Sequence, residues 1–297
     1  MKFGSVDNPE EIDFTLPADH PDTKRVLNKV KDDNEPEVFV GCAKWNRADL
    51  KGFYPRGTKD ELEHYATQFN SIELNATFYR IFPAEQFSKW NEKTPEGFKF
   101  FPKLNQEISH WKRLNETKEV VEHYLYNASN LQEKLGTLFL QMHNNFAPKD
   151  FNRVVTFVEQ WPKEVPLAIE FRHTNWYNDP TVAEELYALL EANNISNVIV
   201  DTAGRRDIMH MRLTNATAFV RYVGANHQSD YDRLDDWVER LKEWKEQGIK
   251  EIDFFVHQNI EKASPLLSAH FIKKLNLALG CELTIPQMGN PKQDTLF

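Results

Sequence analysis

Apolar and polar positions alternate along short stretches of the chain, and longer stretches with helical spacing separate them. The clearest alternating stretch is 71–75, SIELN, whose two aliphatic residues share one face. Its other face carries Glu73 and Asn75, and the aromatic residues Phe78 and Tyr79 follow directly. A carboxylate that is only solvent-exposed is not expected at a strand end beside two aromatic residues, so exposure to solvent alone does not explain Glu73. We therefore expect further functional groups to converge on Glu73.

The same two periods recur from residue 38 to residue 279 and predict strands that alternate with helices. Strands are predicted at 38–43, 71–75, 98–103, 137–142, 167–172, 197–201, 217–223 and 251–257. Helices are predicted at 59–68, 84–92, 117–132, 149–160, 180–192, 231–247 and 264–279. This order of elements is typical of an α/β protein of the TIM (β/α)8-barrel type.

A doubly wound open sheet has a similar alternation and is the main alternative fold. No GxGxxG sequence follows the first predicted strand, so a dinucleotide-binding fold has little support. We expect a single TIM barrel over residues 37–280. Residues 1–36 are an acidic, proline-containing N-terminal extension, and residues 281–297 form a polar C-terminal tail.

The composition is that of a folded protein with a large core, since 40% of the 297 residues are hydrophobic and 21 of them are Phe. The net charge of −9 argues against nonspecific nucleic-acid binding. The two cysteines provide no disulfide framework, and no apolar run approaches the length of a membrane span. We therefore expect a cytoplasmic protein that does not bind membranes.

Polar residues near the ends of the predicted strands form the candidate site, because the active site of a TIM barrel lies where its strands end. On most strands the aliphatic residues share one face, and the other face carries polar or ionisable groups near the C-terminal end. The acids are Glu73, Glu170 and Asp201, and the cations are Lys103, Arg172 and Arg221. Burying these charges without a function requires many satisfied ion pairs, which seldom add net stability. We therefore predict a functional site there.

The balance of charges favours an anionic substrate. The cations suit a phosphate or carboxylate, and the acids are candidates for general acid and base. A two-carboxylate glycosidase built on Glu73 and Glu170 is a further option. The predicted function is therefore an enzyme of hydrolytic type, with Glu73, Glu170 and Asp201 as catalytic groups. The predicted substrate-binding residues are Trp45, Asn75, Tyr79, Lys103, His110, Gln141, Arg172, Arg221 and Asn259.

Histidines near the strand ends leave a metal-dependent alternative open. The candidate ligands are His143, His173 and His257, together with Glu170 or Asp201. No HxH or HExxH spacing supports such a site. A metal-dependent barrel isomerase, lyase or phosphodiesterase stays an alternative, and the main hypothesis involves no cofactor and no metal.

Seven short motifs follow one another in a fixed order. They are FYP at 53–55, FNSIELNATFY at 69–79, TPEGFKFFPK at 94–103, ISHWKRL at 108–114, LGTLFLQ at 135–141, AIEFRHTNW at 168–176 and VRYVG at 220–224. In this order they resemble the YecE-like family, a domain of unknown function. The resemblance implies a TIM barrel with its site at the strand ends, and it implies no particular reaction. The chain departs from the family pattern at Val223, where a His is usual, which puts any mechanism needing that His in doubt.

The last five residues, QDTLF at 293–297, are similar to the peptide with which bacterial proteins bind the replication sliding clamp. In such a peptide Leu296 and Phe297 enter an apolar cleft, and Gln293 forms hydrogen bonds at its rim. The second hypothesis is therefore a non-catalytic ligand-binding or DNA-maintenance protein that docks a sliding clamp through this tail. The alternative is that Leu296 and Phe297 pack onto the chain's own helices.

Overall fold

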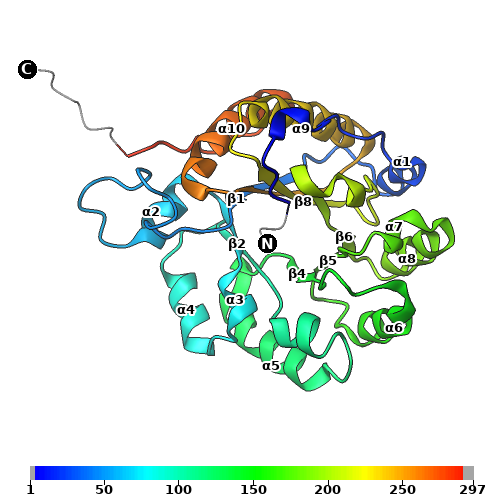
Figure 1. Cartoon of the computed structure of the whole chain (residues 1–297). Coiled ribbons are helices and arrows are strands. Elements are labelled where there is room, and N and C mark those ends of the chain that lie inside the picture. Colours follow the sequence, from blue (N-terminus) through cyan, green and yellow to red (C-terminus); the bar gives the residue numbers. More distant parts are fainter. Residues whose placement is uncertain (1–3, 290–297) are drawn as a thin grey trace, which may run out of the picture.

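The structure, a computed structural model, describes residues 4–289 and is a mixed α/β protein with parallel sheets. Its helices surround the strands, as Figure 1 shows in a view along the strand direction. Gln293, Leu296 and Phe297, which were predicted to bind a sliding clamp, lie outside the described residues. No helix within residues 4–289 is long and apolar enough to span a membrane.

The strands form two parallel sheets, one with the order β3-β2-β1-β9-β8-β7 and one with the order β4-β5-β6. Their bounds are β1 Glu37–Cys42, β2 Ser71–Leu74, β3 Lys99–Pro102, β4 Leu138–Gln141, β5 Leu167–Glu170, β6 Ser196–Asn197, β7 Ile199–Thr202, β8 Thr217–Gly224 and β9 Glu251–Gln258. Every predicted strand is present. The sixth is divided into β6 and β7 on either side of Val198.

The predicted closed barrel is confirmed only in part, because the strand pairing is not continuous. Two isolated parallel bridges, Phe100 with Leu135 and Lys103 with Phe139, join the ends of the two sheets near β3 and β4. At the other end, β6 pairs with β5 and β7 pairs with β8. The described residues thus establish parallel α/β sheets, and an uninterrupted barrel of eight strands is not established.

The helices occur close to the predicted positions. Their bounds are α1 Pro21–Asn28, α2 Glu61–Gln68, α3 Ala76–Tyr79, α4 Ala84–Glu92, α5 Lys118–Ala128, α6 Phe151–Gln160, α7 Asn175–Asn178, α8 Pro180–Ala192, α9 Ser229–Gln247 and α10 Ser264–Leu279. Local signals set several ends: the Asp60 and Asp179 carboxylates cap α2 and α8. The two longest helices, α9 and α10, end at Gly248 and Gly280 in the left-handed conformation that glycine favours.

A small aromatic core explains where the polar groups lie. It contains Phe39, Phe101, Phe139, Ala168, Val198, Val200, Ile208, Phe219 and Phe255. The larger apolar core contains their sequence neighbours, which face the helices. Because side chains alternate between the faces of a strand, the residue two positions after each inner residue faces the same side, nearer the strand end. On β3, β4, β5, β8 and β9 this places Lys103, Gln141, Glu170, Arg221 and His257 on the inner side near the strand ends.

Candidate functional site

Arg221, near the end of β8, is the centre of the candidate site. Its Nε and Nη2 atoms each donate to the Glu73 carboxylate at 2.8 Å, and its Nη1 donates to Glu170 at 2.6 Å. Both carboxylates are fully buried. The two hydrogen bonds from Arg221 to the two oxygens of Glu73 fix the relative orientation of these side chains as well as their separation. The structure therefore brings together three predicted site residues from β2, β5 and β8.

Glu170 links Arg221 to the other two predicted cations. Arg172 Nε donates to Glu170 Oε1, and Gln141 Nε2 donates to both oxygens of Glu170 at 3.0 Å. The amide oxygen of Gln141 in turn accepts from Lys103 Nζ at 2.8 Å. The Lys103 ammonium also lies 4.3 Å from the centre of the Phe78 ring. Gln141 is thus the bridge between the amine and the carboxylate.

Glu73 has two further partners. Asn75 Nδ2 donates to its Oε1 at 2.7 Å, and His257 Nε2 lies 2.9 Å from its Oε2. From the sequence, His257 is predicted only as a candidate metal ligand, and its contact with Glu73 is not predicted. The sequence feature that indicates this contact is the position of His257 two residues after Phe255, which places it on the inner face of β9. We call Glu73, Lys103, Gln141, Glu170, Arg172, Arg221 and His257 the charge cluster.

The cations and anions of the charge cluster shift one another's pKa values. Burial by itself raises the pKa of Glu170, but Arg172 and Arg221 outweigh it and lower the pKa to about 2. Burial opposes ionisation of Glu73 in the same way, and Arg221 and His257 hold its pKa well below the usual range. Burial, with the charges of Arg221 and Arg172, lowers the pKa of Lys103 to about 7. At neutral pH both carboxylates are ionised and the amine titrates.

His110 lies on a π-helical turn, Glu107–Trp111, and packs against the same Phe78 ring as this amine. Its Nδ1 is 2.8 Å from Ser109 Oγ, and its ring centre lies 4.9 Å from that of Phe78 and 5.1 Å from that of His143. Burial, followed by the charges of His143 and Lys103, lowers its pKa to about 4. His110 is therefore a neutral imidazole at the edge of the site.

A surface pocket of about 380 Å³ adjoins the charge cluster on the side of β1 and β2. Two predicted substrate-binding residues, Trp45 and Tyr79, line it, and Asn75 contributes to the part nearest Glu73. Tyr79 is 72% exposed although it is a large aromatic residue. The structure thus places these three residues together, beside the charge cluster rather than within it.

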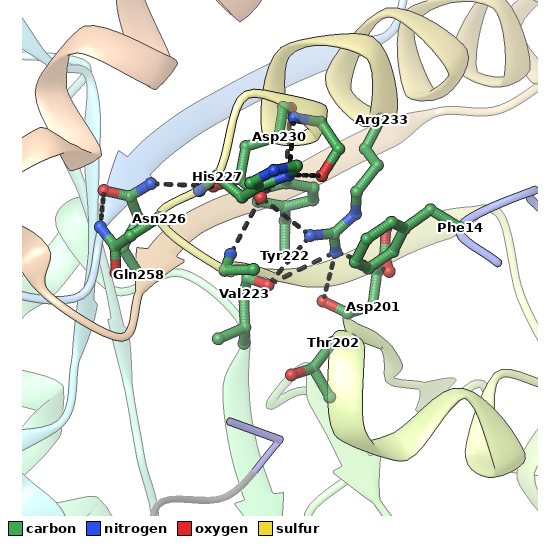
Figure 2. Close-up of polar contacts among 12 residues, drawn as sticks. Phe14, Asp201, Thr202, Tyr222, Val223, Asn226, His227, Asp230, Arg233 and Gln258 are labelled. Carbon is green, nitrogen blue, oxygen red and sulfur yellow. Dashed lines mark hydrogen bonds and ion pairs between the residues drawn. The ribbon is translucent and has the colours of Figure 1, made fainter. Parts of the chain in front are cut away.

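Asp201 is not part of the charge cluster, and the prediction that it joins Glu73 and Glu170 is wrong. Its carboxylate accepts from Arg233 Nη2 and Trp237 Nε1, both at 2.8 Å, and from Arg206. Arg233 and Trp237 lie on α9, so Asp201 faces the helices, as Figure 2 shows for Arg233. The reason is register, because the preceding residue of β7 faces the inner aromatic core.

The remaining predicted residue, Asn259, follows the end of β9. Its backbone N–H donates to the carbonyl oxygen of Gly224 at 3.3 Å. Within residues 4–289 its side chain makes no hydrogen bond to the charge cluster.

In the same part of the chain, no group of three or more His, Cys, Asp and Glu residues is arranged to hold a metal ion.

The comparisons with known proteins agree on one family. The model of the family described as "Protein of unknown function DUF72" matches residues 39–290. The UPF0759 protein YecE of Escherichia coli is 24% identical over 286 residues, which cover 88% of this chain and all of the relative. The UPF0759 protein YunF of Bacillus subtilis is 24% identical over 245 residues, covering 71% of this chain and 85% of the relative.

A solved structure supports the fold. The crystal structure of a DUF72 family protein from Enterococcus faecalis superposes with a TM-score of 0.66 at 21% sequence identity. The match covers 86% of this chain and 99% of that one. At this level of identity the similarity shows a common fold, and none of the descriptions gives an activity.

Proposed function

The chain belongs to the DUF72 family, and from that premise we propose that it is an enzyme acting on a small substrate that carries a phosphate or carboxylate. In this proposal the anionic group contacts Lys103 and Arg172, and Lys103 transfers a proton. The observation that carries the proposal is the environment of Lys103. It is a buried amine, with a pKa of about 7, set among two carboxylates and two guanidinium groups. Groups that titrate near the working pH are the most effective acids and bases.

The charge balance of the cluster supports an anionic ligand. The carboxylates of Glu73 and Glu170 are balanced by the guanidinium groups of Arg172 and Arg221. Protonation of Lys103 therefore takes these five groups from no net charge to +1, to which any charge on His257 adds. When Lys103 is protonated, the cluster carries an excess positive charge that a bound anion neutralises. Anion binding therefore favours the protonated amine, and we expect binding and proton uptake to be linked.

The Lys103 amine also has unused hydrogen-bonding capacity. Within residues 4–289 it forms one hydrogen bond, to Gln141. An ammonium group has three N–H donors, so two stay available to a phosphate or carboxylate oxygen. This differs from Arg221, whose guanidinium is occupied by Glu73 and Glu170. Arg221 was predicted to bind the substrate, and we now assign it a structural role within the site instead.

The two carboxylates have a supporting role in this proposal. Their lowered pKa values make them weak bases that have no proton to donate at neutral pH. A two-carboxylate glycosidase needs one acid with a raised pKa, so this geometry does not favour it. Glu73 and Glu170 instead hold Arg221 and stabilise the charged amine. In a hydrolysis, the Lys103 ammonium gives its proton to the departing group as the bond to that group breaks. The attacking water supplies the hydroxyl, and its remaining proton returns to the Lys103 amine.

Sulfate binding measured by calorimetry tests this proposal, because sulfate does not itself titrate near neutral pH. Titrations near pH 8, in two buffers of different ionisation enthalpy, report the protons taken up. We expect sulfate to bind with uptake that approaches one proton, and Lys103→Met to lose both the binding and the uptake. Lys99→Met, at the start of β3, which ends directly before Lys103, is the matched control. Equal sulfate binding by wild type and Lys103→Met refutes the proposal.

A non-catalytic binding protein is the second candidate. The observation that favours it is the extensive pairing within the charge cluster, where Arg221 bonds to both carboxylates and Arg172 bonds to Glu170. A panel of phosphorylated and carboxylated compounds discriminates between the two candidates by product formation. Turnover that is abolished in Lys103→Met favours the enzyme. Binding without any product favours the second candidate.

We also infer that the two sheets are parts of one TIM-type barrel. The isolated parallel bridges between the β3 and β4 regions support this inference, and so does the single residue that separates β6 from β7. The ring of strands in Figure 1 has the arrangement expected of such a barrel. The charge cluster would then lie at the C-terminal mouth, the usual place of catalysis in this fold.

A further inference from the structure

The pocket beside the charge cluster is built by the two segments that follow β1 and β2. These strands pair in parallel, with Gly41 opposite Ser71, so the segments after them emerge side by side. A Cβ atom at Gly41 would lie 2.3 Å from the Ser71 carbonyl oxygen, so the two strands approach this closely only because residue 41 is glycine. The resulting pocket of about 380 Å³ is within the size range of small-molecule sites.

Two aromatic residues are fixed at the sides of this pocket. The Trp45 ring packs edge-on against Trp90 with ring centres 5.9 Å apart, and the Trp45 carbonyl accepts a hydrogen bond from Tyr54. Tyr79 packs edge-on against Phe78 at 5.0 Å, while most of its own side chain is exposed. Rigid aromatic residues lose little conformational entropy when a ligand packs against them. The exposed position of the Tyr79 ring is not explained by packing in a core. Packing against the ring of a bound ligand explains it.

Polar groups surround the rest of the pocket. Lys44, Asn46 and Asp49 lie on one side and form a small hydrogen-bonded group, in which Asp49 accepts from Asn46 at 2.7 Å and pairs with Lys44 at 3.1 Å. Asn75 lies toward Glu73, and its Nδ2 donates to that carboxylate at 2.7 Å. Within residues 4–289 neither the Asn75 amide oxygen nor the Trp45 indole N–H has a hydrogen-bond partner. Donors and acceptors are therefore available on several sides.

The pocket is continuous with the charge cluster. Asn75 joins it to Glu73, and Tyr79 contacts Phe78, whose ring lies 4.3 Å from the Lys103 ammonium. Glu73 lines the pocket, whereas Lys103 and Arg172 do not, so a ligand in the pocket meets the charge cluster at Glu73. Its anionic group must extend past the Phe78 ring to reach the amine that we propose as the acid. The geometry suits a molecule with an uncharged ring at one end and an anionic group at the other.

We propose that this pocket binds a sugar ring, so that the substrate of the site is an anionic monosaccharide such as a sugar phosphate. The C–H face of a sugar packs against an aromatic wall, and its hydroxyls, which point outward around the ring, match polar groups on several sides. A nucleobase presents hydrogen-bonding groups along its edges and flat apolar faces, which matches this arrangement less well. The inference rests on the proposed function, because the anionic group is assigned to Lys103 and Arg172.

Comparative binding by calorimetry tests the inference. The probes are inorganic phosphate, ribose 5-phosphate, glucose 6-phosphate and adenosine monophosphate. We expect at least one of the sugar phosphates to bind about tenfold more tightly than phosphate. Trp45→Ala and Tyr79→Ala should reduce that affinity to the level of phosphate and leave phosphate binding unchanged. Tyr126→Ala is the matched control, because Tyr126 is 71% exposed and lies on α5, away from the pocket.

The outcomes separate this inference from the proposed function. If phosphate binds but no sugar phosphate binds more tightly, the sugar assignment is overturned while the anion site stands. Adenosine monophosphate binding that exceeds both sugar phosphates and depends on Trp45 overturns it in favour of a nucleobase. If none of the four probes binds, both proposals fail. Tight sugar-phosphate binding that Trp45→Ala and Tyr79→Ala leave unchanged overturns the placement in this pocket.

Discussion

Replacing Arg221 by Met is the most direct test of the charge cluster, because this one guanidinium joins both buried carboxylates. Removing one partner of a buried ion pair usually costs about 3–5 kcal/mol in unfolding free energy, since it leaves the other charge uncompensated. Glu170 keeps Arg172 and Gln141 as partners, whereas the partners that Glu73 keeps among residues 4–289 are His257 and Asn75. The loss therefore falls mainly on Glu73, and we expect Arg221→Met to cost about 3 kcal/mol near pH 8.

The pH dependence of this cost distinguishes electrostatics from lost packing. In wild type the pKa of Glu73 is lowered, so its ion pair stabilises the fold above the ordinary Glu pKa and is lost as the pH falls through the folded value. In Arg221→Met, burial without Arg221 raises the pKa of Glu73. The variant then gains stability relative to wild type as the pH falls from about 8 to about 5, by about 1.4 kcal/mol for each pH unit below the raised pKa.

Urea denaturation followed by tryptophan fluorescence, at both pH values, measures this difference. Combining Arg221→Met with Glu73→Gln should recover most of the stability, because the stranded charge is removed. Arg56→Met, at an exposed position, is the matched control and should lie within about 0.5 kcal/mol of wild type. The reasoning is refuted if Arg221→Met costs less than about 1 kcal/mol near pH 8, or if the cost is the same at both pH values.

Three further predictions concern other parts of the chain. Asp253 is fully buried on β9, and burial, followed by the charge of Glu251, raises its pKa well above the usual range, so stability is lost as the pH rises. Asp253→Asn should therefore melt at a higher temperature than wild type near pH 8 but not near pH 4, and equal gains at both pH values would contradict this. The Arg233 guanidinium lies between the rings of Phe14 and Tyr222, 4.3 and 4.4 Å from their centres (Figure 2), so Phe14→Ala should cost about 1–2 kcal/mol in urea denaturation. An unchanged midpoint would show that the Phe14 ring adds no stability. Deleting residues 293–297, which follow the region matched by the family, should abolish binding to a bacterial sliding clamp in surface plasmon resonance, and a full-length chain that does not bind would end the clamp hypothesis.

Alternating patterns along the chain were sufficient to locate the strands and to name most residues of the charge cluster. Apolar periodicity depends only on local geometry, and each predicted strand is present within a few residues of its expected bounds. The phenylalanines Phe101, Phe139 and Phe219 show why the site was also accessible to prediction. Each precedes a polar residue by two positions, and alternation places both on one face. Lys103, Gln141 and Arg221 could therefore be named from the sequence.

Alternation gives the relative sides of neighbouring residues, but it does not say which side faces the interior. Asp201 shows the difference, because the register of β7 turns it toward Arg233 and Trp237 on α9. The partners of each charge are equally inaccessible to local patterns, since Arg221 lies 148 positions from Glu73 and 51 from Glu170 in the chain. The sequence by itself determined the elements and the ionisable groups at their ends. The tertiary structure alone decided which charges meet, and hence that Lys103, rather than a carboxylate, titrates near neutral pH.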